Sequence, residues 1–110
     1  ATIALREVNW STWKIVEQFA PFGMGNPKPT FLFEGVRIIA PRRFGKENAH
    51  LELSFESAPV KAIAFFAEGS MYDALNAGDI INLVATMELN TFRGKRELRL
   101  RIVEVRKVGA

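Results

Sequence analysis

The spacing of apolar residues changes once along the chain and divides it into two parts. Near the N-terminus the large apolar residues recur every three positions, at Trp10, Trp13, Val16 and Phe19. This spacing predicts one apolar stripe on a helix of about ten residues, with Asn9 as its N-cap. Pro21 ends the helix, because the residue before a proline is pushed out of the helical region. We expect the stripe to pack against the rest of the protein rather than to serve as a stacking platform.

Residues 21–29 contain three prolines and two glycines and form a shaped loop or a linker. From Thr30 the apolar spacing becomes two, which predicts β-strands. The strands are expected over residues 30–39, 50–55, 60–66, 81–89 and 98–102. A basic loop is expected over residues 41–48, a short helix over 70–77 and a hairpin connection over 91–96.

The order of these elements indicates the fold. Three strands, a short helix and a closing hairpin follow one another as in the five-stranded OB barrel. An SH3-like barrel is the alternative, but it leaves the helix before Gly78 unexplained. The sequence therefore predicts a mainly β, single-domain chain, in which residues 1–29 form a lead-in, a helix and a Pro/Gly loop and residues 30–110 form the OB barrel.

Composition restricts the chemistry that the chain can perform. The 110 residues, 48% of them hydrophobic, are enough for one domain with a modest core. The absence of cysteine excludes disulfides, thiolate metal sites and a cysteine nucleophile, and it fits a cytoplasmic protein. With His50 as the single histidine, no catalytic residue and no metal ligand are predicted, and His50 is expected to be an ordinary surface residue. No apolar run approaches the roughly 18 residues of a membrane span, so no membrane partner is expected.

Basic residues are concentrated in the last predicted hairpin, although the net charge is only +3. Between Thr91 and Arg101 one acid, Glu97, stands among five basic residues: Arg93, Lys95, Arg96, Arg99 and Arg101. Phe92 lies at the predicted tip. OB barrels hold single-stranded nucleic acid in this way, with cations along the phosphates and bases stacked on aromatic rings. The alternative is a solvated edge strand that the arginines keep soluble.

A second segment repeats this composition. The predicted loop between the first two strands carries three cations and one ring, namely Arg42, Arg43, Lys46 and Phe44. In an OB barrel this loop and the last hairpin flank the same groove. We therefore expect the two segments to form the two rims of one nucleic-acid site.

Two stretches of the sequence resemble a known family. They are residues 21–31, Pro-Phe-Gly-Met-Gly-Asn-Pro-Lys-Pro-Thr-Phe, and residues 89–102, Leu-Asn-Thr-Phe-Arg-Gly-Lys-Arg-Glu-Leu-Arg-Leu-Arg-Ile. Together with the helix before them, they are similar to the C-terminal OB domain of the RecJ family of bacterial single-strand-specific DNA exonucleases. The resemblance covers almost the whole chain and implies a fragment of a larger protein.

The resemblance also implies what the missing part does. In this family a catalytic core of DHH and DHHA1 domains digests single-stranded DNA from the 5′ end, using Mn²⁺ or Mg²⁺, in recombination and repair. This chain has no Asp-His-His motif, so no metal ligand is carried over and no cofactor is expected in this fragment. The expected partners are single-stranded DNA and the DHH and DHHA1 domains of the parent chain.

Two other functions remain open at this stage. The chain could be a protein-interaction module whose helix and proline loop dock on a catalytic core, with the arginines merely on the surface. It could also be an RNA-binding OB domain of the translation machinery. The RNA alternative fits the charge equally well, but it does not explain the motif at residues 21–31.

Overall fold

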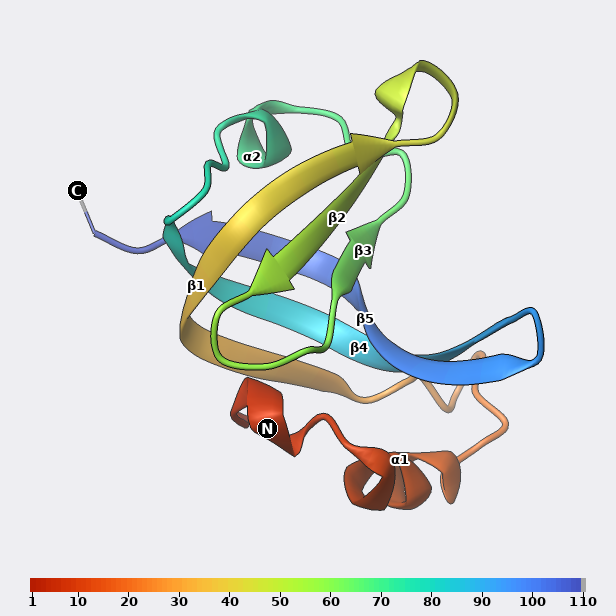
Figure 1. Ribbon diagram of the computed structural model, residues 1–110. Coiled ribbons are helices and arrows are strands. Elements are labelled where there is room, and N and C mark those ends of the chain that lie inside the picture. The colour runs from red at the N-terminus through yellow and green to blue at the C-terminus, as the bar shows by residue number, and fades with distance from the viewer. Residues whose placement is uncertain (110) are drawn as a thin grey trace.

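Five strands close into a barrel in the order β1-β2-β3-β5-β4 in the computed structural model, which describes residues 1–109 (Figure 1). The strands are β1 Thr30–Phe44, β2 His50–Phe55, β3 Ala62–Ala64, β4 Ile80–Phe92 and β5 Lys95–Lys107. All neighbours pair antiparallel except β3 and β5, which are parallel. With one helix before β1 and another between β3 and β4, this confirms the predicted OB barrel.

The barrel interior is filled by the residues that the alternating pattern predicted. Successive side chains of a strand point to opposite faces, so every second residue of β2 and of β4 enters the core. The largest side chains that are fully buried come from four of the strands: Phe33, Ile38, Leu51, Leu53, Ile81, Leu83, Met87, Leu100 and Val105. In the part of the chain that the structure describes, no polar or charged residue is buried.

Strand β1 is longer than its sequence predicts. Its last four residues, including Arg42, Arg43 and Phe44, pair with β2, so the prediction of a loop was wrong for residues 41–44. The strand continues because it changes partners, from β4 to β2, and register shifts at residues 33–36 and 38–40 let it bend between them. Pro41 follows the second bulge, one of the places where strands accept proline.

The N-terminal helix α1, Trp10–Glu17, is capped as the sequence predicts, because the Asn9 side chain accepts a hydrogen bond from the Thr12 N–H. Its apolar stripe is only partly covered. Val16 is buried and Trp13 packs against the core, whereas Trp10 and Phe19 stay largely exposed. Before α1, the 3-10 helix η1 (Leu5–Glu7) buries Leu5 against the barrel.

The second helix, α2 (Ser70–Asp73), is shorter than the predicted 70–77 and lies on the other side of the barrel from α1 (Figure 1). A 3-10 turn, η2 (Lys46–Asn48), connects β1 to β2. No helix in residues 1–109 is both long and apolar enough to cross a membrane.

Residues 21–29 form a shaped loop held by one side chain. The Asn26 amide donates hydrogen bonds to the carbonyl oxygens of Phe19 and Pro21, each at 2.7 Å. Asn26 also forms an antiparallel bridge with Gly23. The loop therefore connects the end of α1 to the start of β1 in a fixed conformation.

Truncating Leu100 is expected to destabilise the barrel. Leu100 is fully buried on β5, at a position that pairs with both β3 and β4. Leu100→Ala therefore leaves a cavity in the core where these three strands meet. We expect the free energy of unfolding to fall by about 2–5 kcal/mol, measured by urea denaturation. Val103→Ala, at an exposed position of the same strand, should change it by less than about 0.5 kcal/mol. Equal losses in the two variants would contradict the assignment of the core.

Asp79 makes the free energy of unfolding depend on pH. Its carboxylate accepts the Asn76 N–H at 2.8 Å and lies 3.1 Å from the Lys107 ammonium, and these contacts lower the pKa of Asp79 below its ordinary value. A lowered pKa in the folded state adds stability above the unfolded pKa, about 3.9, that is lost as the pH falls through the folded value. Wild type should therefore unfold at higher urea than Asp79→Asn at pH 7, and the gap should close below about pH 4. A gap that is constant with pH would refute this.

Candidate nucleic-acid interface

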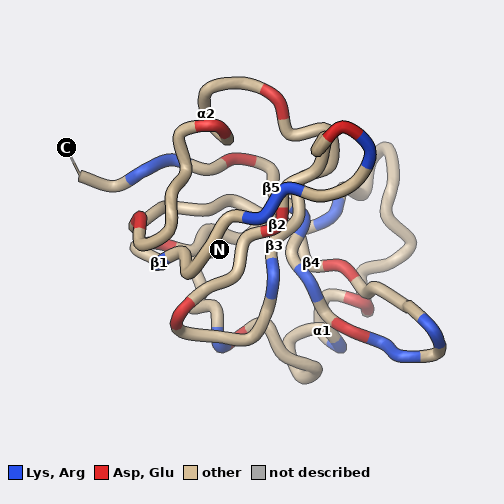
Figure 2. Tube along the Cα trace, turned by 45° about the horizontal axis from the view of Figure 1, so that its top comes forward, with Lys and Arg blue, Asp and Glu red and all other residues tan. Residues whose placement is uncertain are grey.

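The β4–β5 hairpin projects from the barrel and carries basic residues at its tip (Figures 1 and 2). Arg93 and Gly94 form its turn with φ angles of 51° and 77°. Positive angles at both positions are typical of the tight turn that matches the twist of a hairpin. Beside the turn, Phe92 is 64% exposed and the Arg93 guanidinium lies 5.2 Å from the centre of its ring. The tip thus presents a ring and cations, as the sequence predicts.

The two faces of this hairpin carry different contacts. Residues directly opposite each other in a strand pair lie on the same face, so the pairs Phe92–Lys95 and Glu88–Arg99 share the outward face. Arg96 belongs to the other face and lies over the ring of Trp10 at 5.5 Å. Arg96 therefore fastens the hairpin to α1 and is separated from the other cations of the hairpin.

A carboxylate that the sequence analysis did not consider holds the two arginines of β5. Glu88 of β4 accepts a hydrogen bond from the Nε of Arg99, and its other oxygen lies 3.1 Å from an Nη of Arg101. Its side chain is only 12% exposed. The part of the outward face of β5 that carries Arg99 and Arg101 is therefore partly neutralised by the neighbouring strand.

Four aromatic rings gather beside these arginines. His50 lies 5.3, 5.0 and 4.9 Å, between ring centres, from Phe44, Phe65 and Phe66. The Arg101 guanidinium lies 4.4 Å from the centre of the Phe65 ring, close enough for a cation–π contact. Phe65 and Phe66 are 37% and 75% exposed, so flat apolar surface faces solvent here. We call this surface the outer face and define it by Arg42, Phe44, His50, Phe65, Phe66, Arg99 and Arg101.

His50 positions one of these rings through its own hydrogen bond. The Nδ1 atom accepts the backbone N–H of Phe66 at 3.1 Å, so the proton of the neutral imidazole is on Nε2. Gly45 leaves room for this ring, because a Cβ at that position would collide with the His50 Cδ2. The sequence predicts His50 to be an ordinary surface residue, whereas the structure places it at the centre of the aromatic cluster.

Phe65 and Phe66 lie outside the third strand, although the sequence predicts that strand over residues 60–66. Strand β3 ends at Ala64, and Phe66 has a φ of 52°, so the chain turns and both rings leave the core. A signal for this was present in the sequence. Neighbouring residues of a strand point to opposite faces, so two consecutive phenylalanines cannot both enter the barrel.

The predicted second rim divides in the structure. Arg42 lies on the outer face, 3.2 Å from Glu52 and 5.1 Å from the centre of the Phe44 ring. Arg43 points away from this face, where it donates to the Ala67 carbonyl at 2.6 Å and to Asp73 at 2.9 Å. Arg43 therefore ties β1 to α2.

The predicted site residues thus fall into four groups. The outer face collects Arg42, Phe44, Arg99 and Arg101. The hairpin tip carries Phe92, Arg93 and Lys95, and Lys46 is exposed on η2 beside the outer face. Arg43 and Arg96 contact α2 and α1 instead.

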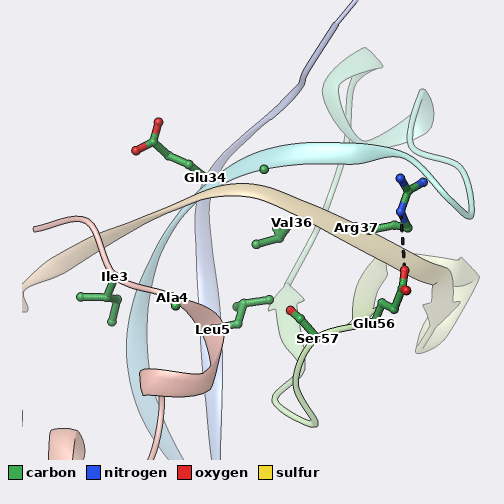
Figure 3. Close-up of a pocket in the computed structure, with 9 residues that line it drawn as sticks. Ile3, Ala4, Leu5, Glu34, Val36, Arg37, Glu56 and Ser57 are labelled. Atoms are coloured by element: carbon green, nitrogen blue, oxygen red, sulfur yellow. Dashed lines mark ion pairs between the residues drawn. The ribbon is translucent and has the colours of Figure 1, made fainter.

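A separate pocket of about 410 Å³ lies between the N-terminal segment and β1. Figure 3 shows Leu5 facing Val36 across it, with the Arg37–Glu56 ion pair of 3.5 Å to one side. The residues that line it are Ile3, Ala4, Leu5, Glu34, Gly35, Val36, Arg37, Glu56 and Ser57. This pocket contains no aromatic ring and lies at the seam where the lead-in docks on the barrel. In residues 1–109, no cluster of three or more His, Asp or Glu side chains is suited to hold a metal ion.

The chain is similar in sequence to proteins of a known family. The family model of the RecJ OB domain matches residues 1–104. The single-stranded-DNA-specific exonuclease RecJ of Bacillus subtilis is 27% identical over 89 residues, which are 79% of this chain and 11% of that protein. The RecJ of Haemophilus influenzae is 31% identical over 98 residues, which are 86% of this chain and 17% of that protein. The chain therefore spans less than a fifth of the length of these relatives.

Solved structures show the same fold. RecJ of Thermus thermophilus in complex with Mg²⁺ superposes with a TM-score of 0.68 at 24% identity, over 90% of this chain and 15% of that one. Its complex with Mn²⁺ gives 0.68 at 26% identity, over 90% and 14%. A putative aspartyl-tRNA synthetase of Leishmania major shares the fold at a TM-score of 0.64 and 17% identity, over 97% and 20%. With the family model matching nearly its full length, the chain belongs to the RecJ OB-domain family.

Proposed function

We propose that this domain binds single-stranded DNA, with its outer face and its β4–β5 hairpin, as the OB domain of a RecJ-type exonuclease. The observation that carries the proposal is the pair of exposed rings, Phe65 and Phe66, set beside arginines on one side of the barrel. Bases of any sequence stack on such rings, each stack contributing about 1–3 kcal/mol. Membership of the RecJ OB family supports the choice of DNA.

In this proposal the position of each residue determines whether it contacts a base or a phosphate. Phe65 and Phe66 stack bases, and the rings of Phe44 and His50 pack against these two phenylalanines and support them. Phe92 offers a further ring at the hairpin tip, where Arg93 and Lys95 neutralise phosphates, and Lys46 does so at the opposite rim. A duplex keeps its bases stacked internally, so it cannot use the rings, and single strands are preferred.

In this proposal the chemistry belongs to the rest of the parent protein. That protein degrades single-stranded DNA from the 5′ end in recombination and repair in the cytoplasm, with DHH and DHHA1 domains as its catalytic core. The Mg²⁺ and Mn²⁺ named for the Thermus RecJ structures support a metal-dependent core. In the described residues no cluster of side chains suits such an ion. In this proposal the domain itself contributes binding of the strand.

Removing the ring of Phe65 tests the proposal. Phe65→Ala should weaken binding of a labelled single-stranded oligonucleotide about 5- to 150-fold, the equivalent of one lost stack. Phe19→Ala removes an exposed ring that belongs neither to the outer face nor to the β4–β5 hairpin, and it should leave affinity unchanged. Fluorescence anisotropy at low and moderate salt measures both variants, with circular dichroism to verify folding.

Competitors in the same assay separate the alternatives. Duplex DNA should compete poorly with the labelled single strand. RNA that competes better than DNA of the same sequence would favour the RNA-binding function instead. Failure of the wild-type domain to bind the oligonucleotide even at low salt would refute the proposal.

One observation favours docking as a second function. Trp10, Ile15, Phe19 and Met24 leave large apolar surface exposed on α1 and the loop that follows it. We propose that the catalytic core of the parent chain covers this surface. Phe19→Ser with Ile15→Ser should then weaken association with a separately produced core at least tenfold, measured by calorimetry, and leave oligonucleotide binding unchanged. Unchanged association would refute the docking role.

A further inference from the structure

We propose that Glu88 and Glu52 make the outer face a site for the bases of the strand and keep phosphates off it. The inference rests on the proposed single-stranded DNA binding and assigns to these two carboxylates the selection of single strands over duplex. The arginines of the outer face then position rings and bases, and the phosphates are bound elsewhere, at the hairpin tip and at η2.

Glu88 occupies the place that a phosphate would need. One of its oxygens accepts a hydrogen bond from the Nε of Arg99 and the other forms an ion pair with an Nη of Arg101, and its side chain is mostly shielded from solvent. Charge-assisted contacts of this kind are the ones that a phosphate oxygen would otherwise make. A phosphate that approached these arginines would meet the carboxylate and would have to displace it.

Glu52 repeats the arrangement on the other half of the outer face. Its carboxylate lies 3.2 Å from the Nε of Arg42 and 3.7 Å from the Nζ of Lys61, with the side chain 17% exposed. Each carboxylate therefore serves two cations. The four cations and two carboxylates leave a net charge of only +2 spread over the face, in place of +4.

The cations outside the outer face are arranged differently. In the described residues Arg93, Lys95 and Lys46 have no carboxylate within 4 Å. These side chains are free to follow phosphates at both ends of the aromatic cluster. A neutral base is not repelled by the carboxylates and gains a stack on Phe65, whose ring already contacts the Arg101 guanidinium.

The charge arrangement gives a physical basis for strand selection. A duplex presents phosphates and hides its bases, so the partly neutral outer face offers it little. A single strand turns its bases inward and its phosphates outward, toward solvent and toward the free cations. Removing a carboxylate should convert two arginines into a phosphate site and weaken the discrimination.

Glu88→Gln tests this because it keeps the shape of the side chain and removes the charge. Binding is measured for three probes: a single-stranded oligonucleotide, a duplex of the same sequence and an abasic oligonucleotide that has only the sugar–phosphate chain. Glu56→Gln is the matched control, since Glu56 also pairs with an arginine, Arg37, but beside the pocket of the lead-in. Glu52→Gln provides a second variant should Glu88→Gln fold poorly.

For wild type we expect the abasic probe to bind at least tenfold more weakly than the normal oligonucleotide. Glu88→Gln should strengthen binding of both the abasic probe and the duplex by three- to tenfold. The slope of log affinity against log salt for the single strand should steepen by about 0.7, the value for one added phosphate contact. Glu56→Gln should behave as wild type.

Two results would overturn the inference and leave the proposed function standing. One is single-strand binding by wild type with an unchanged or shallower salt slope in both Glu88→Gln and Glu52→Gln. The other is an abasic probe that binds wild type as tightly as the normal strand. Absence of binding by wild type to every probe would overturn the proposed function, and this inference with it.

Discussion

The barrel is closed by the parallel pairing of β3 with β5, which involves very few residues. Only Ala62–Leu100 and Ile63–Arg101 are in register there, since β3 has three residues. The β2–β3 pairing on one side and the long β4–β5 ribbon on the other are held together by this seam. The outer face depends on it as well, because the seam brings Phe65, just beyond β3, against Arg101 of β5.

The brevity of β3 also explains why aromatic rings face solvent. A strand that continued would have to place Phe65 and Phe66 on alternate faces, one of them in the core. Because β3 ends at Ala64, the chain turns at Phe66 and both rings come to lie outside, packed around His50. The cost of exposing them is reduced by His50 and the arginines, which cover part of each ring.

Much of this architecture follows from sequence alone, for an identifiable reason. The order of strands, the hairpin turn at Arg93 and Gly94 and the capped helix after Asn9 depend on periodicity and local turn chemistry, which a single sequence displays. The features that were missed depend on pairing between distant segments. Arg42 lies in a strand because β1 exchanges β4 for β2, and Arg43 leaves the groove because Asp73 and Ala67 are near it only in the fold.

The same distinction applies to charge. In the sequence Arg99 and Arg101 read as part of a basic run, since Glu88 is eleven residues from Arg99, across the hairpin. Pairing of β4 with β5 sets the carboxylate directly opposite. A mostly covered ion pair adds little stability compared with well-packed apolar side chains, because desolvation offsets much of the attraction. Stability alone therefore gives no strong reason for three charged side chains at the centre of an aromatic surface. Within the proposed function, two arginines held beside Phe65 by one carboxylate, with their charge halved, have a role: the rings stay available to bases, and the phosphates of a nucleic acid are directed to the margins of the outer face.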